Sequence, residues 1–235
     1  MILLSKMINT DKKIIECVPN FSEGQNSDII DKIASSVQST KNVKLLNVEP
    51  DKDYNRTVIT FAGDPLCVKE AAFKAIAAAA ELIDMSRQRG EHPRIGATDV
   101  CPIIPVANVT KDECVKLSNE LGKDVGNKLG IPVYLYEDTA RSAERRNLEN
   151  IRKGEYEGLE QKLKSWIPDY GPTEYNDKVR RAGATVIGSR FFLIAYNVNL
   201  NTRDVSIANK IAKKVRESGS MTIDETGVKR RDRKS

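Results

Sequence analysis

The segment IIECVPNFSEG, residues 14–24, is a short apolar run closed by a turn-forming sequence. Such a run predicts a buried strand over Ile14–Pro19. Downstream, Asn26 or Ser27 is placed to cap a helix, in which apolar residues between Ile29 and Val37 recur at helical spacing. The segment therefore predicts a buried strand followed directly by an amphipathic helix.

The sequence up to residue 106 adds two strands, a helix and a third strand. They are predicted over Val43–Val48, Arg56–Phe61, Asp64 to about Met85, and Val100–Val106. The first two strands are close enough to form a hairpin. Asp64 fits the N-cap and Pro65 the first position of the long helix. Pro102 and Pro105 indicate that the last strand lies at the edge of a sheet, or that the two prolines lie at the ends of the strand.

The order strand-helix-strand-strand-helix-strand predicts an α/β (α+β) fold, a ferredoxin-like α/β sandwich with its helices on one face of the sheet. Because the strands are apolar on both sides, something else must cover the other face. The remaining predicted elements are a helix over Lys111–Leu129, a strand over Pro132–Tyr136, short surface helices between Arg141 and Lys164, a loop from Pro168 to Gly183, a long strand over Ala184–Leu200, and a helix from Thr202 to Arg216. From Ser218 onward we predict no pattern.

The composition is that of an ordinary globular protein, with 235 residues, 40% hydrophobic and 30% charged residues. We find no signal peptide and no apolar run long enough to span a bilayer, so we expect a cytoplasmic protein without membrane contact. One histidine and four scattered cysteines make a metal site unlikely to form. The net charge of +5 includes a basic run, Lys229–Lys234. We interpret it as a solvated end, and expect no nucleic-acid partner, because the other charges are mixed in sign.

The only histidine, His92, lies in a glycine- and proline-rich loop, Arg89–Gly96. An imidazole in such a loop titrates near neutrality and could serve as an acid or a base. The alternative is a histidine that is merely exposed or hydrogen-bonded. The neighbouring Glu91 and Arg94 could orient the ring or bind a carboxylate, or could be solvated charges.

A series of motifs in this sequence resembles the formimidoyltransferase family, in the same order and over about Ile14 to Gly219. The motifs are Glu16–Gly24, Asn55–Thr57, Leu82–Met85, Gly90–Ala97, Asp99–Pro102, Pro132–Tyr136, Gly154–Tyr156, Pro168–Pro172, Gly183–Val186 and Ala195–Leu200. The resemblance implies transfer of a formimidoyl group between tetrahydrofolate and glutamate, with folate and glutamate derivatives as partners. It also implies two α/β subdomains whose sheets face each other across a folate tunnel, and a homodimer in the full-length family member.

The resemblance assigns roles to individual residues. It makes His92 the catalytic acid and base, and places a family carboxylate at Glu49. It matches the segment Gly171–Gly183 to a folate-contacting loop. The candidate contacts in that segment are Gly171, Pro172, Lys178, Arg180 and Gly183, with Arg181 as a further added charge. Asn20, Arg56 and Arg94 are further candidates for ligand contact.

The domain organisation implied by the resemblance is an amino-terminal subdomain over residues 13–182 and the start of a second, similar subdomain over residues 183–235. Because that second part holds few elements, we expect the chain alone to be a truncated form that lacks catalytic competence. A non-catalytic folate-binding or interaction module is the alternative to an enzyme. A nucleic-acid binder that uses the basic tail is a third possibility.

Overall fold

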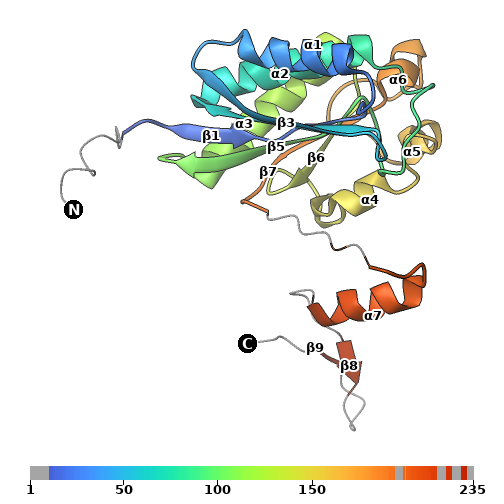
Figure 1. The fold of residues 1–235 in the computed structure, drawn as a ribbon. Helices are drawn as coiled ribbons and strands as arrows, with labels where there is room; N and C mark the ends of the chain where they lie inside the picture. The colour runs from blue at the N-terminus through green and yellow to red at the C-terminus, as the bar shows by residue number, and fades with distance from the viewer. Residues whose placement is uncertain (1–10, 194–197, 199, 216–220, 224–228, 232–235) are drawn as a thin grey trace, which may run out of the picture. The chain divides into compact units, whose positions relative to one another are not determined.

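The computed structural model describes residues 11–193, 198, 200–215, 221–223 and 229–231. Its contacts divide the chain into two compact units, residues 1–192 and residues 193–235. The first unit holds a seven-stranded sheet with its helices, and the second holds a helix and a small hairpin (Figure 1).

The first half of the first unit is the predicted ferredoxin-like arrangement. Its elements are β1 (Ile14–Cys17), β2 (Asn20–Phe21), α1 (Ser27–Gln38), β3 (Val43–Asp51), β4 (Arg56–Gly63), α2 (Pro65–Leu82) and β5 (Thr98–Ala107). β1 and β2 are consecutive strands that both lie between β4 and β5 in the sheet. β3 pairs with the other edge of β4. All these pairs are antiparallel, and the predicted β3–β4 hairpin and fold class are confirmed.

The second half extends this sheet with parallel strands. It comprises α3 (Lys111–Asp124), the π-helical turn η1 (Val125–Leu129), β6 (Val133–Glu137), the 3₁₀ turn η2 (Ala143–Arg146), α4 (Leu148–Arg152), α5 (Leu159–Ser165), α6 (Asp177–Ala182) and β7 (Thr185–Ser189). β7 lies between β5 and β6 and is parallel to both.

β7 corrects one expectation about the region after residue 183 and bears on a second. The predicted strand over Ala184–Leu200 is too long, since β7 ends at Ser189 and residues 190–193 are not strand; of the remainder, residues 194–197 and 199 lie outside the described part. β7 also belongs to the sheet of the first unit, which extends to residue 192. The boundary expected after residue 182 therefore falls before the last strand of that sheet.

The helices begin where their capping residues predict. Asn26 accepts hydrogen bonds from the backbone N–H groups of the first turn of α1, and Asp64 does the same for α2, with Pro65 at the first position. Thr110 and Glu113 form a capping box at α3. Gly130 ends the π-helical turn with a left-handed conformation, φ 62°.

β5 is a central strand, although Pro102 and Pro105 favour an edge or strand ends. Pro102 lies beside the break between β1 and β2, where its carbonyl accepts a hydrogen bond from the Val18 N–H at 3.4 Å. Pro105 lies beyond the residues that pair with β7 and next to a register shift in the β1–β5 ladder. The prolines are tolerated because the ladder is already irregular or one-sided at these two points.

The two faces of the sheet are covered differently. α1, α2 and α3 lie side by side on one face, and α4 lies on the other side (Figure 1). There Tyr134 of β6 packs on Trp166, with ring centroids 6.4 Å apart, and donates a hydrogen bond to the Trp166 carbonyl at 2.8 Å. Over β3 and β4 the same face is more open, because alternate residues of these strands are exposed or half-buried.

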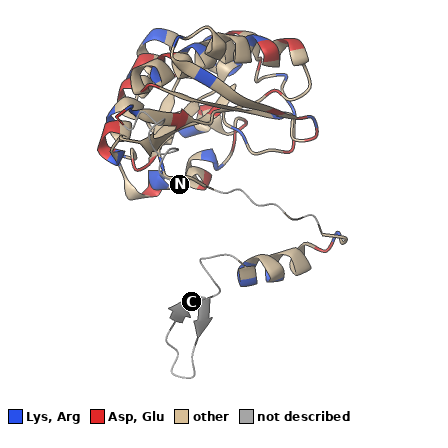
Figure 2. Ribbon diagram, turned by 60° about the vertical axis from the view of Figure 1, so that its left-hand side comes forward, with Lys and Arg blue, Asp and Glu red and all other residues tan. Residues whose placement is uncertain are grey.

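The second unit contains α7 (Val205–Val215) and an antiparallel pair of short strands, β8 (Met221–Ile223) and β9 (Lys229–Arg231). The expectation that residues beyond Ser218 lack structure is wrong for these two strands. In the first unit, basic and acidic residues are interspersed along the ribbon (Figure 2). Within the described residues, no helix is both long and apolar enough to cross a membrane.

The fold predicts different outcomes for two glycine substitutions. A Cβ on Gly183, whose φ is +70°, would lie 2.4 Å from the Cα of Gly96, whereas a Cβ on Gly130 would meet nothing closer than 3.6 Å. We expect Gly183→Ala to lower the free energy of unfolding by about 1–3 kcal/mol or more. Gly130→Asn should cost less than about 1 kcal/mol, because asparagine tolerates the left-handed conformation. Urea unfolding of both variants checks this, and equal losses would contradict it.

Candidate active site

His92 lies in the loop between α2 and β5, beside the turn that joins β3 to β4. The imidazole is half-buried and meets the ring of Tyr54 edge-on, with centroids 6.3 Å apart and an interplanar angle of 87°. Asn55 joins the two segments: its side-chain nitrogen donates to the Arg89 carbonyl at 2.6 Å, and its backbone carbonyl accepts from Gln88 at 3.1 Å. The loop that carries His92 is thus fixed to the hairpin.

The surroundings of His92 favour its neutral form. Burial first, and then the positive charges of Arg56 and Arg152, lower the pKa of His92 to about 4, against the opposing effects of a backbone hydrogen bond at Pro93 and of Glu155. At neutral pH the imidazole therefore has a free lone pair and is ready to accept a proton. His92 is therefore not a fully exposed surface histidine.

Arg56 is placed on the open face of the sheet by the alternation of β4 and is held there by Asn20. Its Nε donates a hydrogen bond to Asn20 Oδ1 at 2.8 Å, and the amide nitrogen of Asn20 donates to the Val18 carbonyl at 3.0 Å. Burial is the main cause that lowers the pKa of Arg56, followed by the charge of Arg152. The structure thus brings Asn20, Arg56 and His92, which the sequence proposed separately, into one neighbourhood.

A buried ion pair between Asp99 and Arg152 lies in the same neighbourhood, and neither residue was a candidate from the sequence. Asp99 is 2% exposed, and Arg152 binds it through two nitrogens, with Nε 3.2 Å from Oδ1. The backbone N–H of Ile95 also donates to Asp99 Oδ1, at 3.1 Å. Burial raises the pKa of Asp99, and Arg152 opposes this. The only sequence signal was the place of Asp99 directly after the His92 motif.

Glu49 lies on β3 and is exposed. Strand register places it opposite Val58 of β4, which is in turn opposite Asn20 of β2, so these side chains share one face of the sheet. Its Oε1 accepts a hydrogen bond from the Asn47 side chain at 2.8 Å. Glu49 is therefore on the face that carries Asn20 and Arg56.

Arg94 is engaged by ion pairs and a hydrogen bond within the protein. Its side chain is 7% exposed and forms ion pairs with Glu155 at 3.0 Å and Glu157 at 2.7 Å. Its Nε donates to Gln88 at 2.9 Å. These bonds use most of its donors, so the geometry favours a role in fixing the His92 loop.

The candidates between Gly171 and Gly183 lie in two groups. A Cβ on Gly171, whose φ is +85°, would lie 2.3 Å from the Ile131 carbonyl oxygen, and the side chain of Lys178 lies beside Gly130. Arg180 is exposed, and its guanidinium donates to the Ser86 hydroxyl at 3.1 Å. Gly171 and Gly183 thus have a packing reason to be glycine, and Pro172, next to Gly171, is half-buried.

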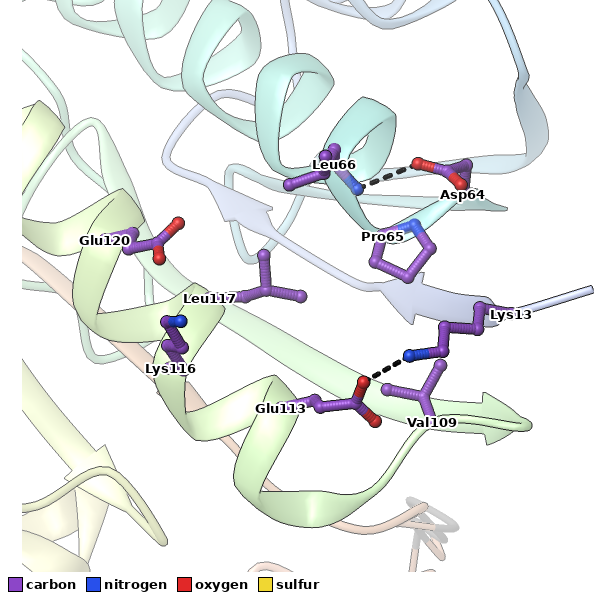
Figure 3. A pocket seen from close by; sticks show the side chains of 9 residues that line it. All are labelled: Lys13, Asp64, Pro65, Leu66, Val109, Glu113, Lys116, Leu117 and Glu120. Carbon is purple, nitrogen blue, oxygen red and sulfur yellow. Dashed lines mark hydrogen bonds and ion pairs between the residues drawn. The ribbon is translucent and has the colours of Figure 1, made fainter.

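Two surface hollows differ in their position relative to this site. One, of about 550 Å³, is lined by Pro93, Arg152 and the segment from Lys153 to Glu155, and therefore adjoins the His92 loop. The other, of about 360 Å³, lies between the starts of α2 and α3 and is lined by charged and apolar side chains, including Lys13, Leu66 and Glu113 (Figure 3). The 18 residues of α2 put its start about 27 Å from its end, where the His92 loop begins, so the second hollow is separate.

No group of three or more histidine, cysteine or acidic residues that could hold a metal ion occurs in the part of the chain that the structure describes. The site as built consists of one neutral imidazole, two guanidinium groups, a buried carboxylate and an exposed one. These groups can move a proton and bind an anion.

Residues 14–190 match the family model described as "Formiminotransferase domain, N-terminal subdomain". The chain belongs to the formiminotransferase family. It is 47% identical over 209 residues to a glutamate formimidoyltransferase of Streptococcus pyogenes, covering 88% of this chain and 69% of that protein. It is 48% identical over 215 residues to a glutamate formimidoyltransferase of Thermoplasma acidophilum, covering 89% and 70%. A formimidoyltransferase-cyclodeaminase of Dictyostelium discoideum is 50% identical over 210 residues, which are 88% of this chain but 38% of that protein.

The lowered pKa of His92 predicts a pH dependence of stability for this family member. Between pH 6.5, the ordinary value, and about 4, the unfolded chain binds a proton at His92 that the folded chain does not. Stability should therefore fall as the pH drops through this window, by at most about 3 kcal/mol. Urea unfolding from pH 7.5 to 4 should show a steeper loss for the native chain than for His92→Gln. Parallel curves would contradict the assignment.

Proposed function

We propose that the chain takes part in transfer of a formimidoyl group between N-formimidoyl-L-glutamate and tetrahydrofolate, with His92 as the proton-transfer residue. Family membership and the names of the relatives support the reaction. The observation that carries the role of His92 is its half-buried imidazole, which burial and the charges of Arg56 and Arg152 keep neutral. Tetrahydrofolate would be the carrier substrate, and no metal is needed for this chemistry.

The reaction requires a proton to move between two nitrogens. Attack of N5 of tetrahydrofolate on the formimidoyl carbon forms a C–N bond and gives a tetrahedral intermediate, and the attacking nitrogen must lose a proton. Collapse then breaks the bond to the glutamate nitrogen, which must gain a proton as it leaves. A single imidazole that accepts the first proton and returns it to the second nitrogen serves both steps. Glu49, on the more open sheet face, would assist by its negative charge.

The proposal includes a second sheet that would enclose the folate from the side opposite to the first sheet. The relatives are longer than this chain, and the family resemblance implies a second sheet facing the first. The open face over β3 and β4 is the side on which such a wall would lie. The homodimer of the full-length family member and the cytoplasmic location stay predictions.

Replacement of the imidazole tests the proposed catalytic role. We expect His92→Ala to slow formimidoyl transfer roughly 10²–10⁴-fold, because general acid–base help is lost. Transfer should be measured with the 235-residue chain and with the same chain extended by the corresponding segment of the Streptococcus relative. Unchanged turnover in the active form would remove His92 from the mechanism. Binding of 5-formyltetrahydrofolate without turnover in either form would favour the non-catalytic folate-binding module.

The exposed cations of α6 test the proposed folate loop. Charge reversal at Lys178, Arg180 and Arg181 should weaken binding of polyglutamylated folate more than binding of the monoglutamate, because steering by charge scales with the charge of the ligand. The matched control reverses the charge of three exposed lysines on α1 and α3, which pack against the sheet: Lys32, Lys116 and Lys123. Titration calorimetry at low ionic strength measures both ligands. Equal weakening of the two, or the same effect in the control, would count against a tail-binding role.

A further inference from the structure

We propose that Arg56, held by Asn20 and supported by Arg152, forms a subsite that binds the α-carboxylate of the glutamate-type substrate beside His92. This inference rests on the proposed function and adds the recognition of the amino-acid partner. It assigns a specificity role to a cation that the sequence proposed only as a general ligand contact.

Arg56 has donors that the protein does not use. Among the residues that the structure describes, its single hydrogen bond is the one from Nε to Asn20, and it has no ion pair. The two terminal nitrogens of the guanidinium thus lack acceptors, although the side chain is half-buried. A guanidinium with both terminal nitrogens free presents a planar fork, which matches the two oxygens of a carboxylate.

The positive charge of Arg56 also favours binding of an anion. Arg152 is already neutralised by Asp99, whose carboxylate is held in turn by the Ile95 N–H. Among the described residues Arg56 has no ion pair, and Glu49 and Asp51, which with Asp99 are the three acids whose charges act on it, are exposed to water. An unpaired, partly buried charge is costly, and a bound carboxylate would compensate it.

The position next to His92 selects the α-carboxylate over the carboxylates of the folate tail. In a glutamate derivative the α-carboxylate is attached to the carbon that carries the reacting nitrogen. A carboxylate fixed on Arg56 therefore keeps that nitrogen near the imidazole. In folate, the glutamate carboxylates are separated from N5 by a methylene group and a whole aminobenzoyl group, so they cannot lie beside the same imidazole while N5 reacts there.

Binding at this subsite would also tune the base. The charged and titratable groups around His92 are Arg56 of β4, Arg152 of α4 with its partner Asp99, Glu155 after α4, and Tyr54 of the hairpin turn. A carboxylate on Arg56 cancels one of the two positive charges that disfavour the imidazolium. The pKa of His92 then rises from about 4 toward the working pH, where an imidazole passes protons most effectively.

The single histidine makes this measurable without turnover, because the imidazole signals in the NMR spectrum of the 235-residue chain all belong to His92. The pKa of His92 is followed with two probes. N-acetyl-L-glutamine keeps only the α-carboxylate, and N-acetyl-L-isoglutamine keeps only the side-chain carboxylate. We expect saturating N-acetyl-L-glutamine to raise the pKa by about one unit and the second probe to leave it unchanged.

Three variants locate the effect. Arg56→Gln should raise the pKa of His92 in the free protein, weaken N-acetyl-L-glutamine binding at least about tenfold, and abolish the further rise. Arg56→Lys should keep the low pKa of the free protein but bind the probe more weakly, because lysine lacks the fork. Arg87→Gln removes an exposed guanidinium of the neighbouring turn, 88% exposed, and should behave as the native chain. Amide spectra that match the native chain show that each variant is folded.

The subsite is overturned if the rise persists in Arg56→Gln, if N-acetyl-L-isoglutamine is equally effective, or if 5-formyltetrahydrofolate alone produces it while N-acetyl-L-glutamine does not. The last result would assign Arg56 to the folate tail. None of these results affects the test of His92→Ala in transfer, so the subsite and the reaction can fail independently.

Discussion

The carboxylate of Asp99 is the constraint on which the arrangement of the site depends. It stands at the start of β5, accepts the backbone N–H of Ile95 from the His92 loop, and holds the guanidinium of Arg152 at the end of α4. A carboxylate that is 2% exposed is tolerated only with such partners, because burying an uncompensated charge costs several kcal/mol. The requirement for both partners fixes the loop to the sheet and brings α4 to the loop. One buried charge therefore fixes β5 and the adjoining His92 loop relative to α4, whose Arg152 lies 53 positions from Asp99 in the sequence.

The His92 loop is held from several sides, which makes its geometry largely preorganised. Asn55 fixes it to the β3–β4 hairpin, and Arg94 fixes it to the segment after α4 through Glu155 and Glu157. At its far end, Gly96 packs on Gly183 so closely that neither position has room for a Cβ. A base that is held in place before the substrate arrives needs little reorganisation during proton transfer. The glycines and charged residues of the motif thus serve the position of the imidazole even where they do not touch a ligand.

Much of the fold could be predicted because its signals are local. The capping residues Asn26, Asp64 and Thr110 start their helices as the sequence indicates, and the βαββαβ order gives the first half of the sheet. The insertion of β7 between β5 and β6 could not be predicted, because the hydrophobic periodicity of a segment indicates a strand but not which strands lie next to it in the sheet. The Asp99–Arg152 pair was also out of reach, since its members are 53 positions apart. A glycine in a sequence can serve either close approach of a ligand or tight packing of the backbone, and the sequence does not distinguish the two. Gly171 and Gly183 were therefore interpreted as ligand contacts alone.

The site lies at the border between a covered and an open half of one sheet face, and this location explains its electrostatics. A single cross-strand row runs from Glu49 through Val58 and Asn20 to Val100, Val186 and Tyr134. Its Tyr134 end is covered by Trp166, and its Glu49 end is exposed. Deep under the covered half, an imidazole would be out of reach of a substrate; on the open half, water would screen the guanidinium charges that hold it neutral. Only the border provides enough burial to suppress protonation together with access for a ligand. The asymmetric covering of the sheet therefore accounts for an imidazole that stays neutral near a guanidinium that has no ion pair among the described residues.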